Sequence, residues 1–273
     1  MTIFTIHGIV DTWEKGKQIF RSYIGRNEYR DFLLRRNAPF QKWRGMLTEQ
    51  DVLTIDDSTI AGAEACGLAK EFGHEVIFFI NPKQIINSEI YWFSILNTLI
   101  DSSNVKSILF QNEKFRLDSF REVKFFRKYV KEILCKETST SINLIFNELS
   151  TKLKVKNDIP HPNHVQAITI DELKELKKMN VCIESHGWNH DEIKYMTDEE
   201  ICSDILQTRN WIKETLNVNS SLYAVPFGST DLSEEVRSKI NGDYFLATDE
   251  LPLGQIHNNC WNRLDITAQL QTK

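Results

Sequence analysis

Short runs of apolar residues recur along the chain, separated by segments of helical composition. The apolar run 52–55 passes into the polar string Asp56-Asp57-Ser58, and the helix-forming segment 59–72 ends at Gly73 before the apolar run 76–80. This succession predicts a β-α-β unit with buried strands. The strand candidates are residues 4–6, 52–55, 76–80, 181–184, 222–225, 244–247 and 264–266.

Capping boxes mark the start of two helices in the second half of the chain. Thr169 with Glu172, and Thr197 with Glu200, both fit the Ser/Thr-x-x-Glu pattern. After the second box, apolar residues recur at helical spacing, so that one helix face is apolar: Ile201, Ile205, Ile212 and Leu216. The alternation of strands and helices predicts an α/β fold with a largely parallel sheet or barrel.

Residues 82–166 depart from this alternation because they are rich in aromatic and basic residues. Within them, 120–134 predicts an amphipathic helix whose polar side carries Arg121, Lys124, Arg127, Lys128 and Lys131. We interpret 82–166 as a helical insertion. Its basic stripe is either a solvated helix face or a peripheral contact for an acidic saccharide or a lipid head group.

Composition and charge exclude several classes of function. The 273 residues include 33 basic and 38 acidic ones, and the net charge of −5 provides no field that would collect nucleic acid. No apolar stretch approaches the ~20 residues of a transmembrane helix, and the opening MTIFTIHGIV lacks the features of a secretory signal. Five cysteines without a Cys-x-x-Cys pair indicate reduced thiols. We therefore expect a cytoplasmic protein with no nucleic-acid partner and no transmembrane segment.

The candidate chemistry lies where two predicted strands end. His186 and His190 stand four residues apart in the string SHGWNH, a spacing that allows two imidazoles to share a metal ion if the chain forms a helical turn. This pair and Asp56-Asp57 each follow a strand candidate, and the carboxyl ends of parallel strands form one common rim. Two histidines and one aspartate there predict a metal site with open positions for water and substrate.

The general base must come from outside the histidine string, because HGWNH lacks the Glu of the HExxH metalloproteases. The second carboxylate of Asp56-Asp57 is the natural source, since a cation that neutralises one carboxylate allows its neighbour to stay ionised. The alternative for Asp-Asp-Ser is an ordinary helix N-cap after a strand.

Five strings resemble the motifs of the polysaccharide deacetylases, which form carbohydrate esterase family 4 and share the NodB-homology domain. LTIDDS resembles the first motif, TFDDG, and ESHGWNH with its following helix resembles the His-x-x-x-His motif. YAVPFG resembles the third motif, Arg-x-Pro-x-Gly, while TIHGIV and NRLDI resemble the opening and closing strands. The resemblance implies a single irregular (β/α)7 TIM-like barrel over residues 1–273, with 82–166 as an insertion within it.

Carried over residue by residue, the resemblance implies that Asp57, His186 and His190 hold one divalent metal ion, usually zinc. It makes Asp56 the general base that activates the attacking water. The backbone N–H of Phe227, in the third motif, would help to hold the oxyanion.

The sequence departs from the family pattern at several positions. The third-motif Arg, which in many members of the family orients the base, is Ala224, and we hypothesise that Arg263 supplies the missing guanidinium and belongs to the substrate-binding residues. The first-motif Gly is Ser58. His257 is a candidate for the general acid by its position, with a loop histidine as the alternative. Trp188, inside the second motif, either stacks on a sugar ring or fills the barrel rim.

These inferences lead to one hypothesis and two alternatives. The leading hypothesis is a metal-dependent sugar N-deacetylase, a hydrolase that cleaves the amide of an acetamido group on a cell-surface polysaccharide, a glycolipid or a precursor sugar such as a sugar nucleotide. A related hypothesis keeps the site and makes the enzyme a deformylase or an O-deacetylase. The alternative of another class is a non-catalytic metal- or carbohydrate-binding module of the same fold.

Overall fold

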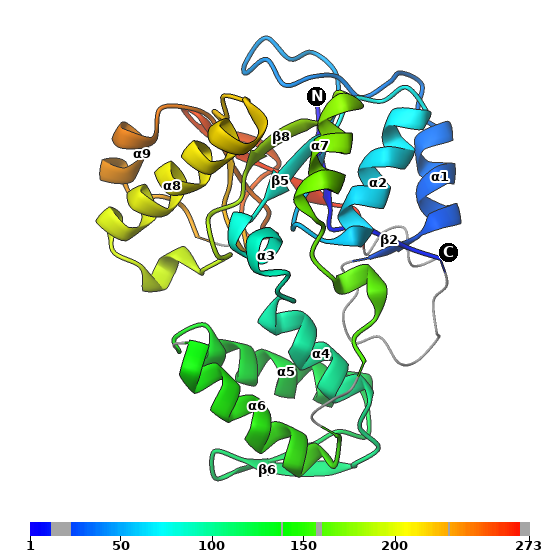
Figure 1. The fold of residues 1–273 in the computed structure, drawn as a ribbon, viewed down its shortest axis with the longest axis vertical. Helices are drawn as coiled ribbons and strands as arrows, with labels where there is room; N and C mark the ends of the chain where they lie inside the picture. The colour runs from blue at the N-terminus through cyan, green and yellow to red at the C-terminus, as the bar shows by residue number, and fades with distance from the viewer. Residues whose placement is uncertain (12–22, 138, 157–159, 229, 268–273) are drawn as a thin grey trace. The chain divides into compact units, whose positions relative to one another are not determined.

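The main sheet has nine strands in the order β11-β12-β10-β9-β8-β5-β4-β1-β13. Figure 1 labels two neighbouring strands of this sheet, β5 and β8. The structure is a computed structural model, and it describes residues 1–11, 23–137, 139–156, 160–228 and 230–267. Neighbouring strands are parallel except β11, which is antiparallel to β12. The strands are β1 (Ile3–Ile6), β4 (Val52–Ile55), β5 (Ile77–Ile80), β8 (Cys182–Ser185), β9 (Tyr223–Ala224), β10 (Tyr244–Leu246), β11 (Gly254–His257), β12 (Cys260–Asn262) and β13 (Leu264–Asp265). A separate parallel pair consists of β2 (Ile9–Val10) and β3 (Ile24–Gly25).

The predicted α/β class with a mostly parallel sheet is confirmed. β4 covers its predicted residues, and the other predicted strands agree within one residue or fall inside their predicted ranges. Every residue of β4 and β5 is buried, which explains why both strands are continuous apolar runs rather than alternating ones. β11 and β12 were not indicated by the sequence.

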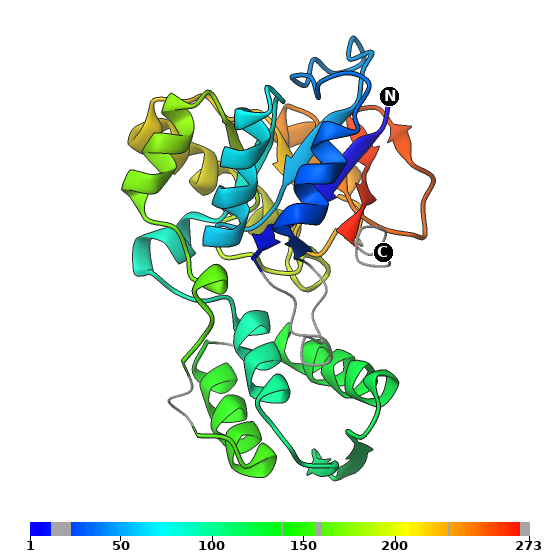
Figure 2. The same cartoon turned by 90° about the vertical axis from the view of Figure 1, so that its right-hand side faces the viewer.

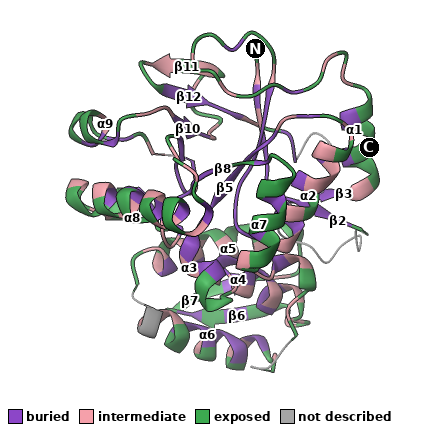
Figure 3. Cartoon of the chain, turned by 45° about the horizontal axis from the view of Figure 1, so that its top comes forward, coloured by how far each residue is buried: buried purple, intermediate pink, exposed green. Residues whose placement is uncertain are grey.

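Helices connect the strands and pack beside the sheet (Figure 2). They are α1 (Arg26–Leu34), α2 (Ile60–Glu71), α3 (Pro82–Asn87), α7 (Ile170–Lys178), α8 (Asp198–Leu216) and α9 (Glu234–Ile240), with a 3-10 turn, η2 (Ile193–Tyr195). Figure 3 shows that α8 buries one face and exposes the other. Both capping boxes are present, with Thr169 and Thr197 accepting a hydrogen bond from the N–H of the Glu three residues later. None of the helices in the described part of the chain has the length and apolarity needed to cross a membrane.

Two strands near opposite ends of the strand order, β12 and β13, are adjacent in the sequence. β12 pairs with β10 and β13 pairs with β1, and Arg263 alone separates β12 from β13. The N–H of Arg263 donates to the carbonyl of Leu246 in β10 at 3.0 Å, and the N–H of Ile266 donates to the carbonyl of Thr5 in β1 at 3.3 Å. This short segment therefore pairs with β10 on one side of Arg263 and with β1 on the other, two strands that lie near opposite ends of the order.

The chain divides into two compact units. The first contains the sheet and comprises the described residues within Met1–Thr12, Ser22–Glu89 and Gln166–Lys273. The second includes the described residues of Ile90–Val165. It begins at Ile90 rather than at the predicted residue 82, because α3 belongs to the first unit.

The second unit has a hydrophobic core of its own, formed by buried residues such as Phe110, Phe126 and Leu149. Its elements are α4 (Trp92–Asp101), the antiparallel hairpin β6 (Ser107–Phe110) and β7 (Glu113–Arg116), α5 (Phe120–Leu134), α6 (Ser139–Leu153) and a 3-10 turn, η1 (Asn163–Val165). The amphipathic helix predicted at 120–134 is α5. Arg127 is only partly exposed and donates to Asn97 Oδ1 at 2.6 Å, and burial lowers the pKa of Arg127 to about 10. The solvated part of the basic stripe is therefore smaller than predicted.

Candidate active site

Four of the predicted site residues lie at or beyond the carboxyl ends of two sheet strands. Asp56 and Asp57 follow β4, His186 follows β8, and His190 lies in the loop that continues from His186. The N–H of Asp56 donates to a carbonyl of β1 at 3.0 Å, and the N–H of His186 donates to a carbonyl of β5 at 2.9 Å. The strand pairing of the sheet thus fixes the backbone from which these side chains project.

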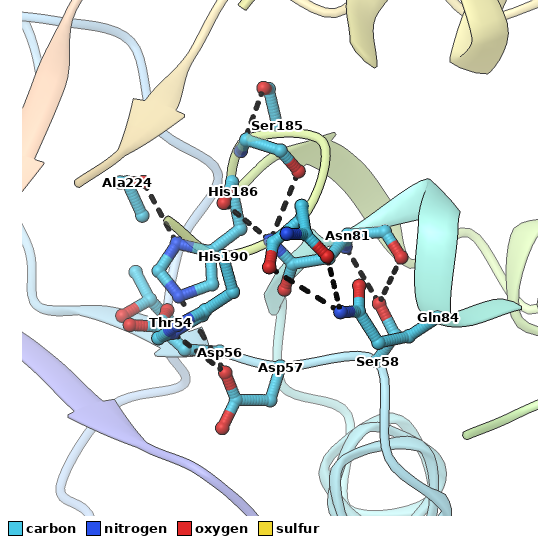
Figure 4. Close-up of polar contacts among 12 residues, drawn as sticks. Thr54, Asp56, Asp57, Ser58, Asn81, Gln84, Ser185, His186, His190 and Ala224 are labelled. Carbon is cyan, nitrogen blue, oxygen red and sulfur yellow. Dashed lines mark hydrogen bonds and ion pairs between the residues drawn. The ribbon is translucent and has the colours of Figure 1, made fainter. Parts of the chain in front are cut away.

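Asp57, His186 and His190 converge on one point (Figure 4). Asp57 Oδ1 lies 3.3 Å from His190 Nε2 and 3.7 Å from His186 Nε2, and the three ligand atoms lie within 4.8 Å of one another. All three side chains are buried. One carboxylate oxygen and two imidazole nitrogens are a donor set that zinc and similar divalent ions bind, so the residues fit the predicted ion.

The orientation of His186 is fixed by the backbone of the third motif. His186 Nδ1 lies 2.8 Å from the carbonyl oxygen of Ala224, which can only accept, so the hydrogen is on Nδ1 and Nε2 presents its lone pair. Burial, with a smaller contribution from His190, lowers the pKa of His186 to about 4. A neutral imidazole with Nε2 free of hydrogen is the form that binds a metal ion.

Three residues at the site have left-handed backbone conformations: Asp57 at φ 68°, His190 at φ 60° and Phe227 at φ 60°. Such conformations cost ~1–3 kcal/mol for residues other than glycine and persist only where the surroundings enforce them. The Phe227 ring contacts the His190 ring edge-on, with centroids 4.6 Å apart. The third motif therefore packs directly against the histidine loop.

Asp56 forms a buried ion pair with Arg263 from the other end of the chain. Arg263 Nη1 and Nη2 each donate to one oxygen of Asp56 at 2.7 Å, while Nε donates to the carbonyl of Leu246 and Nη1 also donates to Thr54 Oγ1. Burial raises the pKa of Asp56, but Arg263, with smaller contributions from His186 and His7, outweighs it and lowers the pKa to about 2. Asp56 is therefore an ionised carboxylate in a fixed orientation.

Arg263 was predicted on the substrate side of the site, and its position differs. Only 2% of the residue is exposed, and its guanidinium faces Asp56 and Thr54. The guanidinium of Arg263 donates to both oxygens of Asp56, whereas Ala224 has no side chain that could do so.

Ser58 and Asn81 form a network that the sequence reasoning missed. Ser58 Oγ accepts a hydrogen bond from the N–H of Asn81 at 2.7 Å and donates to its carbonyl at 3.2 Å. Asn81 Nδ2 donates to the carbonyls of His186, at 2.5 Å, and Gly187, at 3.0 Å. The amide of Asn81 thus ties the histidine loop to the first motif. The sequence signal for Asn81 was its position directly after the apolar run 76–80, as Asp56 directly follows the run 52–55.

Trp188 contacts α8. The backbone N–H of Trp188 donates to both oxygens of Asp204, at 2.9 and 3.0 Å. Burial, with a smaller contribution from Asp191, raises the pKa of Asp204 to about 7. Trp188 also lines a surface groove of about 480 Å³ beside α8 residues that include Trp211 and Asn210. Asp204 was not predicted, because a polar residue in an amphipathic helix carries no local signal for a long-range contact.

His257 does not lie with the other predicted site residues. It ends β11, and its ring contacts Tyr244 and Asp231. Tyr244 begins β10, whereas Asp56 and His186 follow the carboxyl ends of their strands. His257 is therefore at the opposite end of the parallel strands, because the antiparallel hairpin β11–β12 reverses the chain there. The prediction of His257 as the general acid does not agree with this placement.

A family model matches the part of the chain that contains the second and third motifs. The family model described as polysaccharide deacetylase matches residues 148–241, which contain His186, His190 and Phe227. The resemblance to the polysaccharide deacetylases is confirmed. Polysaccharide deacetylases are hydrolases that act on amide bonds, the enzyme class predicted from the motifs. No curated protein matches the sequence.

Solved structures of deacetylases share the fold at low identity. The deacetylase PplD of Streptococcus pyogenes, solved with acetate, is 11% identical with a TM-score of 0.59, and the match covers 100% of this chain and 96% of that one. IcaB from Ammonifex degensii is 11% identical with a TM-score of 0.55, covering 99% and 96%. A de-N-acetylase from Aggregatibacter actinomycetemcomitans is 14% identical with a TM-score of 0.54, covering 96% and 93%. At these identities the likeness concerns the fold.

Proposed function

We propose that this chain is a metal-dependent sugar N-deacetylase that hydrolyses an acetamido group on a cell-surface polysaccharide, a glycolipid or a precursor sugar. The observation that carries the proposal is the ionised carboxylate of Asp56, held by Arg263 next to the convergent Asp57, His186 and His190. The polysaccharide deacetylase match supports amide hydrolysis. The acetate in the PplD structure supports an acetyl group as the part released.

Asp56 is the general base of the proposed reaction. Arg263 engages each oxygen once, and a carboxylate oxygen has a second lone pair, so Asp56 still accepts the proton of an attacking water. A carboxylate with a pKa of about 2 is a weak base, and the water must therefore be made more acidic. A divalent ion held by Asp57, His186 and His190 would supply this acidification and would polarise the substrate carbonyl. The N–H of Phe227 donates to the oxyanion in this proposal.

The leaving amine needs a proton, and the proton accepted by Asp56 is available for it. A base that returns its proton as an acid does not require His257. We therefore assign both proton transfers to Asp56 and none to His257.

The test is a pair of variants with separate readouts. His186→Ala should lose the bound divalent ion and the release of acetate from an N-acetylglucosamine oligomer. Asp56→Asn should keep the ion and lose acetate release, since the amide cannot accept the proton. Asp191→Asn is the matched control, because Asp191 lies next to His190 in the same loop and takes no part in the mechanism. Full activity of Asp56→Asn, or a wild-type protein that binds no divalent ion, would refute the proposal.

The acid that is released from different substrates distinguishes the alternatives. A deformylase would release formate from an N-formyl sugar, and an O-deacetylase would release acetate from an O-acetyl sugar and leave the acetamido group intact. A non-catalytic module would bind an oligosaccharide equally well in the wild type and in Asp56→Asn, and it would release neither acid.

We also propose that the sheet is closed into an irregular (β/α)7 barrel and that the second unit, the predicted insertion, influences substrate choice. The support for closure is the pairing of β12 with β10 and of β13 with β1 on either side of Arg263. We propose zinc as the ion, because zinc binds a set of carboxylate and imidazole ligands of this kind. We propose the cytoplasm as the location, supported by the free cysteines of the described residues.

The basic stripe of α5 is proposed to contact an anionic head group or saccharide. Phe120 and Phe125 are 51% and 63% exposed beside the exposed Arg121, Lys124 and Lys128. Lys124→Glu with Lys128→Glu should abolish sedimentation with vesicles that contain anionic lipid, and equal sedimentation of wild type and variant would contradict the contact.

A further inference from the structure

A second group of metal-binding side chains lies away from the proposed active site. Asp231 precedes α9, His257 ends β11 and Cys260 begins β12. One carboxylate oxygen, one imidazole nitrogen and one sulfur of these residues lie within 4.8 Å of one another. Among the described residues, this group and the Asp57 group are the two that meet this distance.

Nε2 of His257 has three polar neighbours, and one ring nitrogen cannot form a hydrogen bond with all of them. Its Nε2 lies 2.8 Å from Asp231 Oδ2, 3.0 Å from Arg237 Nη1 and 3.1 Å from the Tyr244 hydroxyl. If Nε2 carries a hydrogen for Asp231, it cannot accept one from Arg237. If it accepts from Arg237, two lone pairs oppose each other at Asp231. A cation between Nε2 and the carboxylate removes this conflict, since both atoms then act as electron-pair donors.

We propose that Asp231, His257 and Cys260 form a second metal site, which takes a zinc-class divalent ion and is distinct from the Asp57 site. The combination of thiolate, imidazole and carboxylate selects zinc, cobalt(II) and similar ions over magnesium and calcium, which prefer oxygen ligands alone. Tyr244, whose hydroxyl donates to Asp231 Oδ1 at 2.7 Å, orients the carboxylate.

The exposure of Asp231 and His257 and the position of Arg237 agree with a metal site. The side chains of Asp231 and His257 are 37% and 31% exposed, whereas Cys260 is fully buried, so an ion would enter from the carboxylate side. Arg237 supplies the positive charge in the metal-free form, 3.7 Å from Asp231 Oδ2, and its partly exposed side chain can turn toward water. Burial raises the pKa of the Cys260 thiol to about 11, so binding would release one proton as the S–H bond is replaced by a sulfur–metal bond.

An ion at this position would tie the segment before α9 to the hairpin β11–β12. Its role would be structural or regulatory, and the proposal does not depend on the deacetylase activity. The thiolate also gives the site a spectroscopic signature that the Asp57 site, which has no cysteine, does not share.

The experiment is a titration of chelator-treated full-length protein with cobalt(II), followed by the sulfur-to-cobalt charge-transfer absorption in the near ultraviolet. We expect a band that saturates at one equivalent of thiolate-bound cobalt per chain. Cys260→Ser should abolish the band, and Cys202→Ser, a cysteine on α8 outside the group, should keep it. No band in folded wild type, or a band that survives Cys260→Ser, would overturn the site.

Two further variants decide the matter even if Cys260→Ser fails to fold. His257→Gln should weaken cobalt binding about ten-fold or more through the loss of one ligand. Arg237→Ala should tighten it, because the competing guanidinium is gone. Unchanged affinity in both variants would show that the three side chains form an ordinary polar cluster.

Discussion

Replacement of Arg263 by Met tests the central contact of the proposed site. The change keeps an unbranched side chain and removes the guanidinium that donates to both oxygens of Asp56. Asp56 is 3% exposed and Arg263 is 2% exposed, so bulk solvent does not reach the side of the carboxylate that faces Arg263 and does not replace the two lost hydrogen bonds. Removal of one partner of a buried pair costs about 3–5 kcal/mol, and we expect a loss of this size in the free energy of unfolding.

The loss should depend on pH. In the wild type, the pKa of Asp56 is about 2, below the value of 3.8 for an unperturbed Asp, so the pair contributes about 2 kcal/mol above pH 3.8. This contribution disappears as the pH falls toward 2. Without Arg263, burial dominates and raises the pKa of Asp56 above its ordinary value. The variant then loses stability as the pH rises through this raised pKa, so the difference from wild type is larger at neutral than at acidic pH.

Urea unfolding of wild type, Arg263→Met, Asp56→Asn and the double variant measures the coupling. Arg35→Met is the control, because Arg35 and Asp31 form an exposed pair of the kind that contributes at most about 1 kcal/mol. The double variant should be more stable than Arg263→Met, since it contains no unpaired buried charge. A loss below about 1 kcal/mol in Arg263→Met, or unchanged turnover in Arg263→Ala, would refute the assignment of Arg263 as the residue that positions Asp56.

Three further predictions concern the loop and helix around the site. Asn81→Ala should weaken metal binding about 10- to 100-fold, measured by competition with a chelator, because His186 loses a support of its backbone; wild-type affinity would contradict this role. Because the pKa of Asp204 is raised to about 7, its ionisation should destabilise the wild type as the pH rises through this value. Asp204→Asn should therefore lose less unfolding free energy over the same pH range, and the same pH profile as wild type would contradict the raised pKa of Asp204. Thr197→Ala should cost about 1 kcal/mol in urea unfolding through the lost capping box, whereas Thr197→Ser should restore most of it.

Local patterns predicted the elements whose stability is local. The strand at 52–55 is an uninterrupted apolar run with both faces buried, and the boxes at Thr169 and Thr197 satisfy helix-end N–H groups within four residues. The hairpin β11–β12 has neither kind of signal. Its strand β11 contains no fully buried residue, so no alternation of apolar and polar positions marks it.

The predicted site residues also divide into those placed by a local strand pattern and those placed by long-range pairing. Asp56, Asp57 and His186 each follow a strand, and parallel pairing brings the ends of strands to one rim, so their meeting follows from the strand prediction. Arg263 is 207 residues from Asp56 in the sequence, and its position depends on the pairing of β12 with β10 and of β13 with β1. The order of the motifs along the chain could suggest Arg263 as the partner of Asp56, but it could not predict where Arg263 lies in the fold.

His257 shows why order along the chain is a weak guide near a reversal of direction. A histidine late in the sequence matched the expected position of a general acid, and a parallel strand there would have carried it to the rim. The antiparallel pairing of β11 with β12 directs it to the opposite end of the strands, beside Asp231 and Cys260. The same reversal that removes His257 from the proposed reaction thus completes the second group of metal-binding side chains, and the cobalt titration tests that consequence of the hairpin.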